Sequence, residues 1–363
     1  MKWEKKKVSD VCELAYGKSL TADSRIQGEY PVYGSAGEVG THNNFIVEGP
    51  GIIIGRKGSV GTVYYEKRNF YPIDTSYYVV LKPENDLRFL YYKLQTLGLN
   101  KLNSDAAVPG LNRNVAYEQS SDFPPLPTQR NIAAILSAYD DLIENNLKRI
   151  KLLEEKAFLR YKQILETEEL TAGIVGDLAI VKSGFAFKSK DWSENGFSVI
   201  KIRNIGNNDI DLVNCSFIPE NIAETATKAK LNAGDLLIAM TGATVGKIGM
   251  MPKTETAFYL NQRVGQFIPK TSNAEYFLFC FFNEPNAKNA VESLASGAAQ
   301  PNISGSQIES IKMFYPKFEI IKEFGKEVKN HFELIWNLKQ QNTRLRAARD
   351  ILLPRLMSGQ IEV

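Results

Sequence analysis

Residues 128–166 read TQRNIAAILSAYDDLIENNLKRIKLLEEKAFLRYKQILE, a stretch that contains neither glycine nor proline. Its apolar residues recur at alternating steps of three and four, which is the heptad spacing of a helix with one buried seam. The seam positions are Ile132, Leu136, Tyr139, Ile143, Asn146, Ile150, Leu153, Ala157, Arg160 and Ile164. Such a helix would be roughly 57 Å long, and its apolar stripe would need a partner in water.

A second stretch with the same spacing follows Pro316, and Pro354 and Gly359 are expected to end it. Its seam positions are Ile321, Phe324, Val328, His331, Ile335, Leu338, Asn342 and Leu345. Gly325 interrupts it and should weaken the first turns by about 1 kcal/mol relative to alanine. The two helices can pair with each other, antiparallel. Asn146 and Asn342 either set the register of this pair, at some cost in stability, or are merely tolerated there.

The two halves of the chain present the same features in the same order. The matching segments are 8–17 with 175–184, 29–32 with 196–199, 51–63 with 234–248, 104–112 with 296–304, and 123–125 with 314–316. Chance similarity of glycine loops would not preserve this order, so the pattern predicts a duplication. A repeat this long is a whole domain followed by its helix and not a solenoid unit.

Short β-rich runs dominate the parts that precede the helices, and glycine, asparagine, aspartate and proline turns separate them. This pattern is typical of small twisted sheets with a few short helices. The predicted fold class is therefore α+β, with two similar domains separated by two long antiparallel coiled-coil helices in a pseudo-two-fold tandem repeat. The expected boundaries are 1–127 for the first domain, 128–170 for the first helix, 171–317 for the second domain and 318–363 for the second helix with its tail.

The composition limits the chemistry that this chain can perform. Its 44 basic and 41 acidic residues leave a net charge of only +3, so a nucleic-acid partner would require basic groups gathered on one face. The two histidines, His42 and His331, lie far apart and have no ligand or acid–base partner at a suitable spacing. Cys12, Cys215 and Cys280 are widely spaced and odd in number, which is typical of reduced thiols in a cytoplasmic protein.

The glycine loops admit two readings. Residues 242–247, GATVGK, resemble a phosphate-binding loop, but one residue is missing between the glycines. Ile248 also stands where a hydroxyl group would hold magnesium. A loop that faces DNA explains the pattern better, because glycine permits a close backbone approach and the neighbouring polar side chains suit phosphates and base edges. Ordinary tight turns between strands remain the alternative for any single residue.

The candidate DNA-binding residues are Lys18, Arg56, Lys57, Ser59, Asn112, Arg113, Lys188, Arg203, Thr241, Thr244, Lys247, Gln262, Arg263 and Asn302. Gln262 and Arg263 are possible base readers, because glutamine pairs well with adenine and arginine with guanine. Their counterparts in the first half are expected to be Thr75 and Ser76. Two domains that read different sequences would diverge in this way.

Several of these segments resemble the specificity subunit (HsdS) of type I restriction–modification systems. The resemblance covers essentially the whole chain and is carried by residues 123–130 (FPPLPTQR), 242–246 (GATVG), 296–304 (SGAAQPNIS) and 352–361 (LLPRLMSGQI). It implies two target-recognition domains, each of which reads one half of a split DNA sequence. The helices would set the gap between the half-sites and dock two methyltransferase subunits, and translocase–nuclease subunits would join the larger complex.

The same resemblance implies a non-catalytic, DNA-binding subunit of a restriction system that defends against foreign DNA by means of DNA methylation. The chain itself would have no catalytic residue, metal or cofactor, because S-adenosylmethionine and ATP would be bound by the partner subunits. The sequence agrees, since it contains no adenine-methylation box and no intact phosphate loop. Two alternatives stay open: a specificity subunit of a type IIB-like restriction enzyme, and a coiled-coil adaptor that binds only protein.

Overall fold

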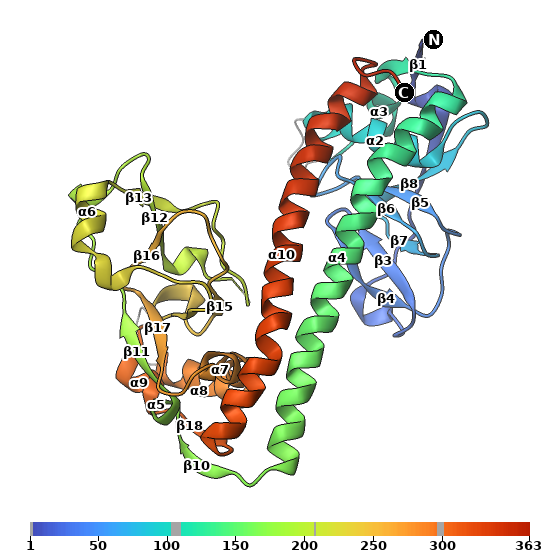
Figure 1. Cartoon of the computed structure of the whole chain (residues 1–363). Coiled ribbons are helices and arrows are strands. Elements are labelled where there is room, and N and C mark those ends of the chain that lie inside the picture. The colour runs from blue at the N-terminus through green and yellow to red at the C-terminus, as the bar shows by residue number, and fades with distance from the viewer. Residues whose placement is uncertain (1–2, 103–109, 207, 296–300) are drawn as a thin grey trace. The chain divides into compact units, whose positions relative to one another are not determined.

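The computed structural model describes residues 3–102, 110–206, 208–295 and 301–363 (Figure 1). Contacts within the chain divide it into two compact units. Unit 1 comprises residues 1–144 together with 342–363, and unit 2 comprises residues 145–341. The two longest helices, α4 (Leu126–Thr167) and α10 (Phe318–Met357), each contribute one part to either unit.

Unit 1 contains three small sheets. Its strands are β1 (Glu4–Lys7), β2 (Cys12–Tyr16), β3 (Tyr30–Gly34), β4 (Gly37–His42), β5 (Gly51–Gly55), β6 (Val63–Glu66), β7 (Tyr71–Pro72), β8 (Ser76–Leu81) and β9 (Ser120–Phe123). The sheet orders are β2-β8-β5-β6, β4-β3-β7 and β1-β9; β3 and β7 run parallel, and the other neighbouring strands run antiparallel. The short helices are α1 (Val8–Val11), η1 (Ala22–Ser24), α2 (Leu87–Thr96), η2 (Leu99–Lys101) and α3 (Arg113–Tyr117).

Unit 2 repeats this plan. Its strands are β10 (Thr171–Ile174), β11 (Ala179–Ser183), β12 (Phe197–Ile200), β13 (Ser216–Ile218), β14 (Leu236–Ala239), β15 (Ile248–Met250), β16 (Phe258–Leu260), β17 (Val264–Pro269) and β18 (Lys312–Tyr315). They form the sheets β11-β17-β14-β15, β13-β12-β16 and β10-β18, with β12 and β16 parallel. Each sheet of unit 1 thus has a counterpart with the same strand order, which confirms the predicted duplication.

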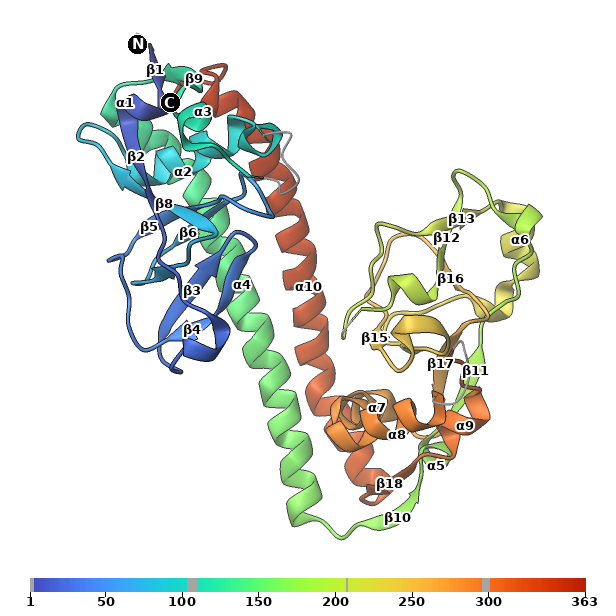
Figure 2. The ribbon, with the colours of Figure 1, turned by 180° about the vertical axis from the view of Figure 1, so that it is seen from behind.

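The helices of unit 2 differ more from those of unit 1 than the sheets do. They are α5 (Val175–Leu178), η3 (Ser189–Asp191), η4 (Ile202–Asn204), α6 (Glu220–Thr225), η5 (Thr227–Ala229), η6 (Gly242–Thr244), α7 (Ala274–Asn283), α8 (Pro285–Ala295) and α9 (Gly305–Glu309). Helix α7 lies beside α10 (Figure 2) and is almost entirely buried, and its Phe277 and Phe279 pack on Phe324 and Phe332 of α10. Helices α7 and α9 correspond to α2 and α3 of unit 1.

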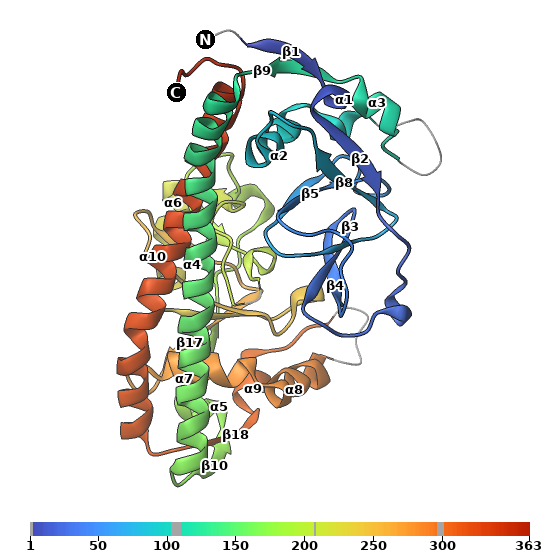
Figure 3. The same ribbon diagram turned by 90° about the vertical axis from the view of Figure 1, so that its right-hand side faces the viewer.

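The long helices run antiparallel within each unit. In unit 1, Ile132 and Leu136 near the start of α4 share a core with Leu356 and Met357 at the end of α10. Strand β1 and the C-terminus lie at this same end of unit 1 (Figure 3). In unit 2, Ile150 of α4 packs with Ile335 and Leu338 of α10. Nearer the end of α4, Tyr161 packs on Phe324, close to the start of α10. The predicted pairing of two long antiparallel helices is therefore confirmed.

Most of the predicted seam is buried, and two positions are wrong. Tyr139, Leu153 and Leu345 are half-buried, while the remaining apolar and asparagine positions are buried. Near the end of α4, Tyr161 is buried in place of Arg160, whose guanidinium instead pairs with Glu327 at 3.0 Å. In α10, Phe332 is buried in place of His331. A straight α-helix drifts by about 20° per heptad from a strict heptad pattern, so over the four heptads from Ile132 to Arg160 the buried face moves by nearly one residue.

The helix ends also differ from the prediction. Helix α4 begins at Leu126, two residues before the expected start, with Pro127 in its first turn. Proline is tolerated there because the first amides of a helix have no intrahelical acceptor. Helix α10 continues through Pro354 to Met357, although Pro354 was expected to end it. This proline lies in the last turn, where its missing amide removes only one helical hydrogen bond.

Candidate nucleic-acid interface

In unit 1 the predicted loop residues gather at one end of the sheet β2-β8-β5-β6. The loop that follows β5 forms a bridge from Lys57 to Gly110, and the amide of Leu111 donates to the carbonyl of Arg56 at 2.8 Å. Unit 2 repeats this arrangement. Thr241 bridges Asn302, and the amide of Ile303 donates to the carbonyl of Met240 at 2.9 Å. The fold therefore brings each glycine loop beside the segment that precedes α3 or α9.

The glycines of these loops meet a geometric requirement. Gly58 and Gly242 have φ values of +81° and +74°, and Gly61 and Gly246 have φ values of +70° and +81°. A Cβ atom at Gly61 would also lie 2.3 Å from the backbone of Asn100. Only glycine adopts this conformation without strain. The loop of unit 2 leads through the three-residue η6 into strand β15 and not into a long helix, so it lacks the helix N-terminus on which a phosphate-binding loop depends.

Two predicted arginines of unit 1 meet at an aromatic ring. The guanidinium carbon of Arg56 lies 4.9 Å from the centroid of the Tyr16 ring, and that of Arg113 lies 5.0 Å from the same centroid. Tyr16 is the last residue of β2 and is 46% exposed. Arg56 also donates from Nη1 to the carbonyl oxygen of Asp74 at 2.7 Å. The side chains of Lys18 and Lys57 are exposed on neighbouring segments.

Asn112 has a structural role that the sequence did not reveal. Its side-chain oxygen accepts hydrogen bonds from the amides of Asn114 and Val115 at 2.9 and 3.4 Å, so it caps α3. In unit 2 this cap is Ser304, whose hydroxyl accepts from the amide of Gln307 at 3.2 Å. Asn112 therefore corresponds to Ser304, and only its NH2 group is left for a ligand. Ser59 is exposed in the loop of unit 1.

In unit 2 not all of the predicted residues lie at the glycine loop. Gln262 and Arg263 are exposed directly before β17, and the carbonyl of Arg263 accepts from the amide of Met240, beside Thr241. The buried hydroxyl of Thr241 has no hydrogen-bond partner among the described residues. The hydroxyl of Thr244 donates to the carbonyl of Ile202 at 3.4 Å, which ties the glycine loop to η4.

The remaining predicted residues of unit 2 lie around this loop. Arg203, on η4, donates from Nη2 to the carbonyl of Asn214 at 3.3 Å and to the hydroxyl of Ser216 at 3.1 Å. Lys247 is half-buried where the loop enters β15. Lys188 is exposed on the segment that leads into η3, away from the glycine loop in the sequence, and no described contact joins it to the other predicted residues.

Strand register corrects one predicted correspondence between the halves. The amide of Arg56 donates to the carbonyl of Thr75, as the amide of Met240 donates to that of Arg263. Arg263 therefore corresponds to Thr75, and Gln262 corresponds to Asp74. The prediction that Gln262 and Arg263 match Thr75 and Ser76 was wrong by one residue, because small insertions shift the alignment without a signal in the residues themselves. Part of the aligned 104–112 and 296–304 motif, 104–109 and 296–300, lies outside the described residues.

With this geometry established, comparison with known proteins identifies the family. The family model described as "Type I restriction modification DNA specificity domain" matches residues 1–155 and again residues 169–347. The chain belongs to this family of specificity subunits. The type I restriction enzyme MjaVIII specificity subunit of Methanocaldococcus jannaschii is 26% identical over 99% of this chain and 93% of its own length. The HindI specificity subunit of Haemophilus influenzae is 35% identical over 33% of the chain and 26% of its own length.

The fold agrees with this membership. A crystal structure of the S subunit of a type I restriction–modification system from M. genitalium matches the specificity subunit with a TM-score of 0.69. The match covers 98% of this chain and 96% of the other, at 21% sequence identity. The chain is thus a type I specificity subunit with two DNA-recognition domains, as the sequence predicted.

The structure adds aromatic residues to the candidate interface of this specificity subunit. Tyr16 was not among the predicted DNA-binding residues. Its place at the end of an alternating strand, directly before Gly17, could have marked it as an exposed aromatic residue at a loop. In unit 2 the ammonium group of Lys201 lies 3.3 Å from the centroid of the Trp192 ring. Burial, followed by the charge of Arg203, lowers the pKa of Lys201. No sequence spacing marks this pair, because the two residues are brought together only by the loops around β12.

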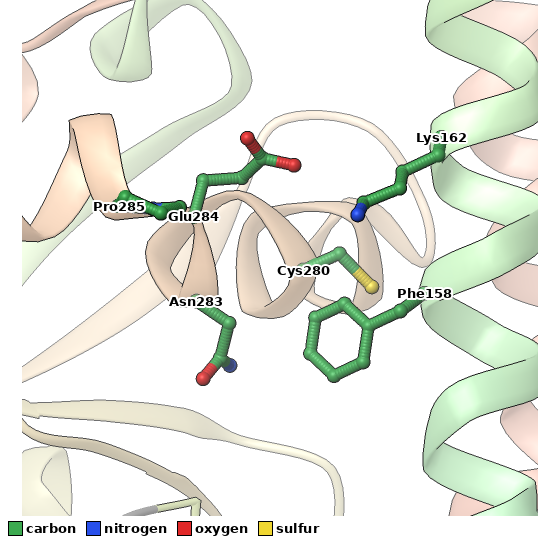
Figure 4. Close-up of a pocket in the computed structure, with 6 residues that line it drawn as sticks. All are labelled: Phe158, Lys162, Cys280, Asn283, Glu284 and Pro285. Atoms are coloured by element: carbon green, nitrogen blue, oxygen red, sulfur yellow. The ribbon is translucent and has the colours of Figure 1, made fainter. Parts of the chain in front are cut away.

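A separate hollow of about 270 Å³ lies in unit 2, away from the predicted residues. It is lined by Phe158, Lys162, Cys280, Asn283, Glu284 and Pro285. Figure 4 shows Lys162 extending from α4 toward Cys280, with Phe158 beside them. Burial raises the pKa of the Cys280 thiol, so this cysteine is a poor nucleophile. Cys12, Cys215 and Cys280 are all free and buried.

The described residues contain neither a candidate metal cluster nor a helix that could span a membrane. No group of three or more histidine, cysteine, aspartate or glutamate side chains among them could hold a metal ion. None of the helices formed by these residues is both long enough and apolar enough to span a bilayer.

Proposed function

We propose that this chain is the DNA sequence-specificity subunit of a type I restriction–modification complex, and that each domain reads one half of a split target. This proposal rests on one end of the four-stranded sheet, which is built in the same way in both units. Both units place a glycine loop beside the segment before α3 or α9, and the two copies present different polar residues. A repeated scaffold with divergent side chains suits two unlike half-sites, because scaffold and backbone contacts fix orientation and side chains read base edges.

The charge distribution of unit 1 supports DNA as the ligand. Elsewhere among the described residues of this unit Lys7, Lys67, Arg68, Arg88 and Arg349 pair with carboxylates, while others, such as the exposed Lys5, do not. In the part of unit 1 that the structure describes, Lys18, Arg56, Lys57 and Arg113 at the sheet end have no carboxylate partner. Unpaired cations that share one end of a domain attract the phosphates of DNA.

The helices have apolar side chains that their pairing leaves uncovered. Leu152 and Leu159, seven residues apart on α4, are 63% and 67% exposed. Residues seven apart lie on nearly the same face of an α-helix, so the two leucines form a surface suited to a protein partner. We propose that the helices dock two methyltransferase subunits here and set the spacer between the half-sites. Translocase–nuclease subunits would join the larger complex.

In this proposal the chain is a non-catalytic subunit that binds no cofactor of its own. S-adenosylmethionine and ATP would be held by the methyltransferase and translocase subunits, and the complex would act on cytoplasmic DNA. The loop of residues 242–247 supports this division of labour, because it enters a strand where a nucleotide-binding loop would open a helix.

The decisive experiment maps methylated adenines genome-wide in cells with and without this gene. A split motif with a fixed unread spacer should be methylated only when the gene is present. A gel shift of the assembled complex on DNA with and without that motif provides the second measurement. Unchanged methylation together with equal binding to both DNAs would instead identify a protein-only adaptor.

A further inference from the structure

In the first domain two arginines contact the ring of Tyr16 at the end of the sheet β2-β8-β5-β6. The two arginines are not equivalent. Arg56 is anchored, because its Nη1 donates to the carbonyl of Asp74 at 2.7 Å while its guanidinium stays 4.9 Å from the Tyr16 ring. The guanidinium of Arg113 has no such hydrogen-bond anchor among the described residues. Its guanidinium carbon lies 5.0 Å from Tyr16 and 6.0 Å from Tyr117.

The donors of Arg113 are therefore available to a ligand. Among the described residues none accepts a hydrogen bond from its guanidinium, and none pairs with it as a carboxylate. The N–H donors of a guanidinium lie in its own plane, so a guanidinium over an aromatic ring can still direct two of them to two acceptors at once. The backbone of Arg113 is held as well, because the preceding Asn112 caps α3.

The second domain lacks these three residues at the corresponding described positions. Strand register and the helix caps assign Ser183 to the position of Tyr16, Met240 to that of Arg56 and Gly305 to that of Arg113. None of these residues can stack a guanidinium or donate two parallel hydrogen bonds. The difference is therefore specific to the first domain and is not part of the shared scaffold.

We propose, resting on the proposed function, that Arg113 reads a guanine in the half-site of the first domain and that Tyr16 is its positioning residue. The O6 and N7 atoms of guanine offer two acceptors in the major groove at the spacing of a guanidinium fork. The Tyr16 ring reduces the freedom that Arg113 loses on binding. Arg56 completes the platform from its anchored position. The second domain reads its half-site without this contact.

The test uses the full chain assembled with its methyltransferase subunits. Methylation rates are measured on duplexes in which each guanine of either half-site is replaced in turn. Arg113→Ala should abolish discrimination at one guanine position, a loss on the order of 10-fold to 100-fold, because a bidentate arginine–guanine contact carries that much selectivity. Discrimination in the other half-site should be unchanged. Arg113→Gln, which keeps a long polar side chain, should lose the same guanine requirement.

Tyr16 variants separate positioning from folding. Tyr16→Ala should weaken discrimination at the same guanine by a smaller factor, about 3-fold, whereas Tyr16→Phe keeps the ring face and should retain it. Lys5→Ala, an exposed lysine of β1, is the matched charge control and should leave every base preference unchanged.

The possible results separate a failure of the proposed Arg113–guanine contact from a failure of the proposed function. If the wild-type complex methylates a split target but Arg113→Ala slows all duplexes by one common factor, Arg113 contacts phosphate and the inference is overturned alone. The inference is also overturned alone if the split target has no essential guanine in the half-site of the first domain. If the wild-type complex recognises no split target, the proposed function is overturned and this inference with it.

Discussion

Lys93 is a lysine enclosed by aromatic rings in the core of unit 1. It is 2% exposed, its ammonium group lies 5.5 Å from the centroids of Trp3 and Phe123, and Nζ donates to the carbonyl of Met357 at 2.8 Å. Burial lowers its pKa to about 8. The residue ties the end of α10 to α2, and this role requires its hydrogen bond more than its charge.

This lowered pKa makes the stability of unit 1 depend on pH. Between about pH 8 and 10.5 the unfolded chain binds more protons at Lys93 than the folded chain does, so the contribution of Lys93 to stability rises with pH. Relative to Lys93→Met, the wild type should gain about 2 kcal/mol in free energy of unfolding from pH 7.5 to 9.5. Urea unfolding at both pH values measures this. The exposed control Lys5→Met should show no such change, and a constant difference for Lys93→Met would refute the prediction.

Gly325 shows how one residue position can be judged wrongly from helix propensity. The sequence indicated only a weakened turn, but a Cβ atom here would lie 2.3 Å from the Cβ and the carbonyl oxygen of Asn273. Asn273 precedes α7 and has a φ of +67°. Glycine therefore lets α10 approach the start of α7 closely.

Gly325→Ala should consequently destabilise the chain by about 2 kcal/mol, although alanine is the better helix former. The clash is with the carbonyl oxygen of Asn273 and with its Cβ, which is fixed to the backbone, so neither atom can move aside cheaply. Thermal or urea unfolding measures the effect. Asn330→Ala, at an exposed position on the same helix, should be neutral or slightly stabilising, and similar behaviour of the two variants would contradict the packing argument.

At the scale of elements, a polar clasp fixes the helix pair of unit 1 beside its apolar seam. Arg349 of α10 donates from Nη1 to Asp140 of α4 at 2.6 Å, and the hydroxyl of Tyr92 on α2 donates to the same carboxylate. Burial alone would lower the pKa of Arg349, but its hydrogen bonds with Asp140 and Asp350 raise it. Both side chains of the pair are largely shielded from water, so solvent screens the attraction less than at the surface.

A double-mutant cycle on Asp140→Ala and Arg349→Ala should therefore give a coupling energy of about 1–2 kcal/mol. The matched comparison is the exposed pair Lys151 and Glu155 on α4, whose coupling should stay below about 0.5 kcal/mol. Both cycles are measured by urea unfolding at low salt. Equal coupling in the two pairs would show that the clasp does not fix the helices.

At the scale of the whole molecule, the proposed spacer role of the helices makes a geometric prediction. Removing seven residues from α4 and seven from α10 keeps the seam in phase and shortens each helix by about 10 Å. The unread spacer should then shrink by about three base pairs, or binding should be lost because the half-sites no longer face the domains. Methylation mapping with the shortened subunit gives the spacer directly. An unchanged spacer would defeat the ruler role.

The near-neutral charge of the chain leads to a second prediction at this scale. With a net charge of +3, the isolated subunit should bind its target only weakly, with a dissociation constant of roughly 10⁻⁶ M or weaker at physiological salt. The partner subunits would then supply many of the phosphate contacts. Fluorescence anisotropy on the isolated chain and on the assembled complex compares the two. Nanomolar binding by the isolated chain would contradict this division.

The sequence by itself determined the duplication, the two long helices and most of the buried seam. The heptad spacing and the duplicated motifs are patterns along the sequence, so they can be recognised without information on contacts between distant residues. It also located both glycine loops, because left-handed backbone positions such as Gly61 admit little besides glycine. Only the tertiary structure decided what those loops meet. The contacts of Arg56 and Arg113 with Tyr16 and the close approach of Gly325 to Asn273 join residues 40 to 97 positions apart. No local pattern encodes such contacts, because they arise from how separate strands and helices pack.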